Sequence, residues 1–157
     1  MVSKVHAKVL VVLVLLAVAG PAPAQDRFGY LQSHLNTYPD DALFNLLEAR
    51  HGLKALVGQD YGRLRKNFAV VAPTEEIQGY LVANGCMAHN CWPEKGLLAV
   101  NLTTGKLTVG ILSDCRKITI YSQEGLRLEQ LPGAVQQWVA TCRRECGRQI
   151  TPLIIQR

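Results

Sequence analysis

Residues 1–24 have the pattern of a cleaved secretory signal, and this pattern limits what the rest of the chain can be. Two lysines supply the positive start, residues 9–19 are an unbroken apolar run, and residues 22–24 (Ala-Pro-Ala) form an A-x-A cleavage site. An apolar run of 11 residues cannot span a membrane, which takes about 20. We therefore expect no membrane anchor and one domain over residues 25–157, because 133 residues suffice for one domain and not for two.

The signal also holds two of the 17 lysines and arginines in the chain. Without it, 15 basic and 12 acidic residues remain, a net charge of +3. This charge is too small to indicate a nucleic-acid-binding protein, and export fits that class poorly. We expect no nucleic-acid partner.

All five cysteines follow the signal. In an oxidising compartment they are read as disulfides before they are read as metal ligands. We expect no cofactor and no metal. Because five is an odd number, one thiol must be free or paired with another chain.

The order of elements after the signal is a helix, a run of antiparallel strands, and a helix. The first helix starts at Asp40 or Asp41 and stops by Gly58, with a break at Gly52. The strands are expected at residues 68–71, 77–83, 97–102, 106–112 and 117–121, and the last helix starts near Pro132. This order predicts an α+β fold: an antiparallel sheet of about five strands with the N- and C-terminal helices packed on one side.

The most informative stretch is a candidate disulfide loop between two predicted strands, made of Cys86, Met87, Ala88, His89, Asn90 and Cys91. Its cysteine spacing is too long for the Cys-x-x-Cys of thiol oxidoreductases. A ring this small would stabilise the fold by only about 2 kcal/mol. Its better use is to hold four residues in one shape, which lowers the ordering cost when they bind a partner. A tight connection with an idle histidine is the alternative interpretation.

Two further cysteines, Cys142 and Cys146, lie one turn apart on the last predicted helix, where a bond between them is geometrically unfavourable. We expect Cys115 to pair with Cys142 or Cys146, which would stabilise the fold by about 3.5 kcal/mol. The leftover thiol is either buried or joins two protomers in a homodimer. No histidine lies near these cysteines in the sequence, so they are not expected to bind a metal.

The candidate loop and its flanks resemble the Ivy family, which are periplasmic inhibitors of vertebrate lysozyme. The resemblance covers residues 41–113 and is carried by residues 82–91, 96–100 and 105–113, with a Phe44-Asn45 pair on the preceding helix. The family's loop reads Cys-Lys-Pro-His-Asp-Cys, so His89 matches the family's histidine.

Three residues in the loop depart from that pattern: Met87 replaces Lys, Ala88 replaces Pro and Asn90 replaces Asp.

The resemblance implies a non-catalytic, periplasmic inhibitor whose loop enters the active-site cleft of a lysozyme or of a lytic transglycosylase-type enzyme. His89 would sit between the two catalytic carboxylates. A retaining glycosidase holds these about 5–5.5 Å apart, so one imidazole can hydrogen-bond to both.

Two other functions fit the same residues. One is an envelope binding or scaffold protein that recognises a peptidoglycan-processing protein or glycan without blocking turnover. The other is a small hydrolase with His89 as its base, which requires a concave site, whereas an inhibitor requires a protruding one. Arg63, Arg65 and Lys66 form a small basic cluster that we interpret as a solvated strand edge.

Overall fold

The computed structural model describes residues 28–157, so the predicted signal lies outside the described residues. Within the described range no helix is long and apolar enough to cross a membrane. The helices are η1 (Gly29–His34), α1 (Asp41–His51), α2 (Leu53–Val57), η2 (Gly58–Asp60), α3 (Tyr61–Lys66), η3 (Leu128–Gln130) and α4 (Gly133–Cys146). The strands are β1 (Val70–Val71), β2 (Glu75–Ile77), β3 (Tyr80–Cys86), β4 (Lys95–Asn101), β5 (Leu107–Ser113), β6 (Lys117–Ser122) and β7 (Leu153–Gln156).

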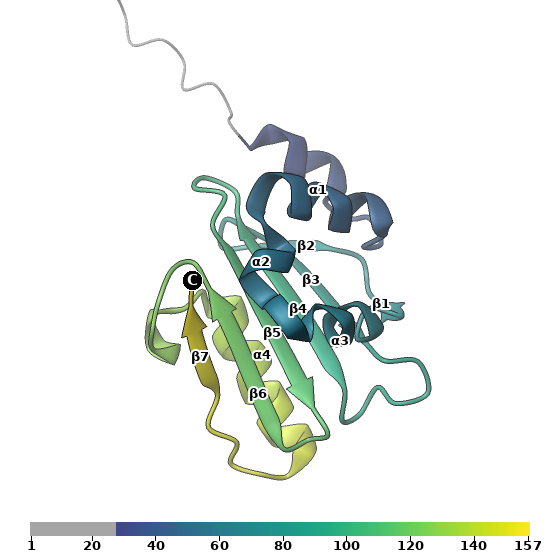
Figure 1. The fold of residues 1–157 in the computed structure, drawn as a ribbon, viewed down its shortest axis with the longest axis vertical. Helices are drawn as coiled ribbons and strands as arrows, with labels where there is room; N and C mark the ends of the chain where they lie inside the picture. Colours follow the sequence, from purple (N-terminus) through teal and green to yellow (C-terminus); the bar gives the residue numbers. More distant parts are fainter. Residues whose placement is uncertain (1–27) are drawn as a thin grey trace, which may run out of the picture.

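The strands form one open sheet in the order β1-β3-β4-β5-β6-β7, and β2 also pairs with β3. All neighbours are antiparallel except β6 and β7, which run parallel (Figure 1). The α+β class is confirmed, but the sheet has seven strands rather than about five. The two additional ones are short: β2 forms a hairpin with β3, and β7 follows the last helix.

Helices cover both faces of this sheet, so the prediction that the terminal helices pack on one side is wrong. Leu98 packs with α1–α3, whereas its neighbour Leu97 packs with α4. Figure 1 shows α4 on the opposite face of the sheet from α1–α3. The physical reason is that the central strands are apolar at successive positions, not at alternate ones, and a sheet of such strands must be covered on both faces.

The first helical region follows its sequence signals closely. The side chain of Asp40 accepts a hydrogen bond from the Leu43 N–H at 3.0 Å, which caps α1. Gly52 adopts a left-handed φ of 65° and ends α1 there, as predicted. Two features differ from the prediction. Residues 61–66 form helix α3, where no helix was predicted, and β1 covers only residues 70–71 of the predicted strand at 68–71.

Candidate functional site

The candidate loop joins β3 to β4 and extends beyond the end of both strands (Figure 1). Cys86 is the last residue of β3 and pairs with Lys95, the first residue of β4. A disulfide joins Cys86 to Cys91, whose Cα atoms lie 4.7 Å apart. The loop is therefore closed twice, by the strand ladder and by the disulfide.

A tight turn fills the ring that this disulfide closes. The Asn90 N–H donates to the Met87 carbonyl at 3.0 Å, and His89 has a φ of 60°, as at the third residue of a type II turn. This left-handed backbone costs a residue other than glycine about 1 kcal/mol. The side chains of Ala88, His89 and Asn90 are all exposed. The histidine thus lies at a convex tip and not in a concave site.

The segment that connects the loop to β4 is held from both faces of the sheet. Glu94 is only 3% exposed, and its Oε1 accepts hydrogen bonds from Arg63 of α3 at 2.9 Å and from the Asp114 N–H at 3.1 Å. The next residue, Lys95, forms an ion pair with Glu145 of α4. Since successive side chains of a strand point to opposite faces, these two residues tie the loop to α3 on one side and to α4 on the other.

Two glycines at the base of the loop let another segment pack closely against it. Gly85 and Gly96 pair across β3 and β4. A Cβ at Gly96 would lie 2.6 Å from the Phe68 ring, and one at Gly85 would lie 2.6 Å from the Asn67 carbonyl oxygen. The buried Asn67 side chain donates to the Lys95 carbonyl at 2.9 Å. This close contact fixes the strand ends from which the tip projects.

A comparison with protein-family models finds a match over residues 48–145, more than half of the chain, to the model described as Inhibitor of vertebrate lysozyme (Ivy). The chain belongs to the Ivy family. The resemblance to the family is therefore confirmed. The match covers residues 48–113 of the predicted range and extends through most of α4, while the Phe44-Asn45 pair lies before its start. Comparisons with curated proteins and with solved structures find no match.

The family membership gives the departures in the loop a structural meaning. Ala88 occupies the second position of the turn, where the Ivy pattern has Pro and where proline favours type II geometry. Met87 is half-buried at the first position, so replacing the family's Lys removes a cation from the base of the tip and not from its apex.

The second disulfide joins Cys115 to Cys146 and leaves Cys142 as the free cysteine. The sequence left open whether Cys142 or Cys146 pairs with Cys115. Cys142 packs in the core with Val135 and Val139, which lie seven and three residues before it on the same face of α4. Because Cys142 is fully buried, it cannot reach a second protomer in this conformation. Both disulfides fit an oxidising compartment.

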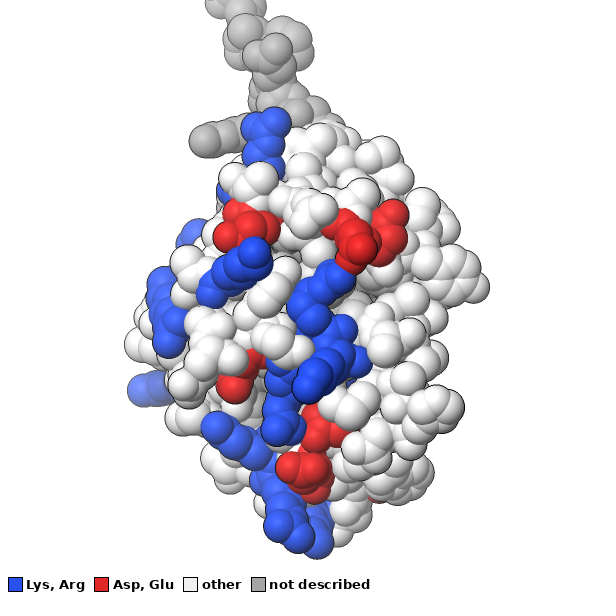
Figure 2. Space-filling view, turned by 45° about the vertical axis from the view of Figure 1, so that its right-hand side comes forward, with Lys and Arg blue, Asp and Glu red and all other residues white. Residues whose placement is uncertain are grey.

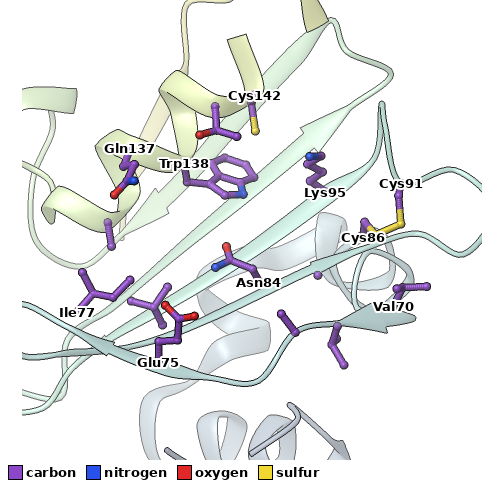
Figure 3. A pocket seen from close by; sticks show the side chains of 16 residues that line it. Val70, Glu75, Ile77, Asn84, Cys86, Cys91, Lys95, Gln137, Trp138 and Cys142 are labelled. Atoms are coloured by element: carbon purple, nitrogen blue, oxygen red, sulfur yellow. A yellow bond between two sulfur atoms is a disulfide. The ribbon is translucent and has the colours of Figure 1, made fainter. Parts of the chain in front are cut away.

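A groove of about 560 Å³ lies between β3 and α4 and reaches the loop disulfide (Figure 3). Its polar lining includes Glu75, Asn84 and Lys95, and Cys142 also lines it. Burial raises the pKa of the Cys142 thiol to about 12, which keeps it protonated and unreactive at neutral pH. Among the described residues, no group of three or more His, Cys, Asp or Glu could hold a metal.

Charged side chains beside the loop are mixed in sign. Figure 2 shows a band of Lys and Arg with Asp and Glu beside it. The basic cluster Arg63, Arg65 and Lys66 lies on helix α3 and not on a strand edge as predicted. Arg65 pairs with Asp41, and its guanidinium lies 4.0 Å from the centre of the Phe44 ring. Two of the three cations are therefore partnered.

Sequence reasoning assigned no role to Trp92 or Glu94, and it interpreted Arg63 as part of a solvated basic cluster and not as a support of the loop. A lone glutamate after a loop is expected to be solvent-exposed, and only the packing of α3 against the sheet shows that Glu94 is buried and bonded to Arg63. Trp92 had a signal that could have found it, since a Trp-Pro pair directly follows the second loop cysteine.

Proposed function

We propose that this member of the Ivy family is a periplasmic inhibitor of c-type lysozyme that acts after removal of residues 1–24. The loop of residues 86–91 enters the active-site cleft and carries His89 between the two catalytic carboxylates. The observation that supports this most is the exposed position of His89 at the apex of a disulfide-closed turn. A hydrolase that used this histidine as its base would need it in a concave site.

The chemistry of an imidazole suits this role. It has two ring nitrogens, and both donate hydrogen bonds when the ring is charged. The two carboxyl groups of a retaining glycosidase are about 5–5.5 Å apart, so one ring can contact both. An imidazole there would occupy the place of the sugar and favour the ionised form of the general acid, which must be protonated to act.

The turn supports the proposal through pre-organisation. His89 already has the left-handed φ of 60° in the free chain, and the disulfide and the Asn90–Met87 hydrogen bond hold it there. Binding therefore needs little further ordering of the tip, and less binding free energy is lost to conformational entropy. With a net charge of only +3 and a cationic partner, the fit of the loop and not long-range attraction must supply the affinity.

The test is lysis of a cell-wall substrate by a c-type lysozyme, titrated with the exported chain. We expect lysis to stop near one equivalent. His89→Ala should weaken binding by about 2 kcal/mol or more, as loss of a central anchor does. His34→Ala is the matched control, because it removes a histidine from η1. Unabated lysis at excess protein would overturn the proposal, and equal inhibition by wild type and His89→Ala would overturn the role of the loop.

A further inference from the structure

Trp92 is an exposed aromatic side chain directly after the loop disulfide. It is 62% exposed, whereas Trp138, the other tryptophan of the chain, is 9% exposed and packs in the core. Large aromatic residues are usually well buried in folded proteins. Tryptophan is also among the side chains that are enriched at the energetic anchors of protein interfaces. The side chain therefore has apolar surface that the fold itself does not cover.

The backbone around this tryptophan is fixed on both sides. The Cys91 disulfide precedes it, and the Pro93 carbonyl that follows accepts a hydrogen bond from the Cys115 N–H at 3.1 Å. The Glu94 N–H also donates to the Asn90 carbonyl at 3.3 Å, which closes the turn over Trp92. A partner that contacts the indole ring would have only the side chain to order.

The position of Trp92 relative to His89 places both in one interface. Three peptide units separate them, so their Cα atoms are no more than about 11 Å apart. A protein interface of ordinary size buries about 800 Å² on each partner, which corresponds to a radius of about 16 Å. An interface centred on His89 therefore includes the position of Trp92.

We propose that Trp92 is a second anchor for the inhibited enzyme, packing against the apolar wall of the polysaccharide-binding cleft beside the carboxylates that His89 contacts. This inference rests on the proposed function. Ligand sites are lined mainly by apolar and aromatic side chains with a few polar groups. An indole ring matches such a wall, because it offers a broad apolar face and one N–H donor. It also provides contact area in a loop that lacks the family's lysine.

The test uses the full exported chain labelled with 5-fluorotryptophan, with a c-type lysozyme added unlabelled. The spectrum should contain two ¹⁹F resonances, which Trp92→Phe assigns. We expect the Trp92 resonance to shift or broaden at one equivalent of enzyme while the Trp138 resonance stays in place. In a parallel binding titration, Trp92→Ala should raise Kd by about 30-fold or more, as loss of an anchor does. This increase should persist at high salt, because the contact is apolar.

Leu126→Ala is the matched control, because Leu126 is 60% exposed and follows the far end of β6 from the loop. It should change Kd by less than about twofold. Suppose that the enzyme binds and is inhibited. If Trp92→Ala then keeps the wild-type Kd, or the Trp92 resonance of the wild-type chain does not move, the second anchor is wrong and the proposed function stands. If the enzyme neither binds nor is inhibited, both fail.

Discussion

The two disulfides lie at the same end of the sheet but differ in what they connect. Cys86 and Cys91 are 5 residues apart and close an exposed turn, whereas Cys115 and Cys146 are 31 apart and tie the β5–β6 turn to the end of α4. Loop entropy makes the first bond worth about 2 kcal/mol and the second nearly twice that. The comparison suggests that the larger ring stabilises the fold and the smaller ring serves recognition.

The two regions also differ in their surroundings. The Cys115–Cys146 bond packs beside the core under α4, while the tip of the small ring is exposed at Ala88, His89 and Asn90. They meet at several contacts. The Cys115 N–H donates to the Pro93 carbonyl, the Asp114 N–H donates to Glu94, and Lys95 pairs with Glu145. Separate roles for the two rings therefore require that these contacts transmit little from one to the other.

The largest effect on stability is expected from removing the larger ring. The double variant Cys115→Ser with Cys146→Ser should lose about 3.7 kcal/mol of unfolding free energy, because the unfolded chain regains the entropy that the bond removes. Urea unfolding measures this loss. The affinity for lysozyme should stay within about threefold of wild type. A much larger loss of affinity would show that the two regions are not separate.

A smaller effect is expected where α3 supports the loop. Arg63→Met removes a hydrogen bond from a carboxylate that is almost fully buried, Glu94, and should cost about 2 to 3 kcal/mol of unfolding free energy. Arg65→Met is the control, because its partner Asp41 is exposed, and it should cost less than about 1 kcal/mol. Equal losses in urea unfolding would show that Glu94 does not hold the loop.

The glycine pair at the base of the loop gives a third comparison. Gly96→Ala places a methyl group against the Phe68 ring and should cost about 1 to 2 kcal/mol of unfolding free energy through overpacking. Gly62→Ala in α3 is the matched control. Its Cβ would meet no atom within 4 Å, so it should be neutral or slightly stabilising. A neutral Gly96→Ala in thermal unfolding would mean that Phe68 moves without cost.

The smallest effect is expected at the tip itself. Ala88→Pro restores the family's residue at the second position of the turn and should stabilise the fold by up to about 1 kcal/mol, by restricting the unfolded chain. Kd for lysozyme should fall by a few-fold for the same reason. A rise in Kd would indicate that this turn differs from the one that the enzyme binds.

Local signals in the sequence predicted much of the fold. The Asp40 cap, the break at Gly52 and the hairpin between β4 and β5 all depend on residues close together in the chain. Placing α4 on the opposite face requires recognising that Leu97 and Leu98 are both buried. Side chains of one strand can pack into a separate core on each face of the sheet.

The support of the candidate site was less predictable, because it depends on contacts between distant segments. Arg63 and Glu94 are 31 residues apart, and nothing in the local sequence marks Glu94 as buried. The partner of Cys115 was left open for a related reason. Which cysteine of α4 faces the core depends on how the helix is rotated over the sheet, and in the structure Cys142 faces it.

The most direct test of separate roles is the affinity for c-type lysozyme of the double variant Cys86→Ser with Cys91→Ser, measured by calorimetry beside its urea unfolding. We expect Kd to rise about tenfold or more while the unfolding free energy falls by no more than about 2 kcal/mol. The tip would then have lost its fixed shape while the fold remained. An unchanged Kd in the folded variant would contradict the claim that this small ring exists for recognition.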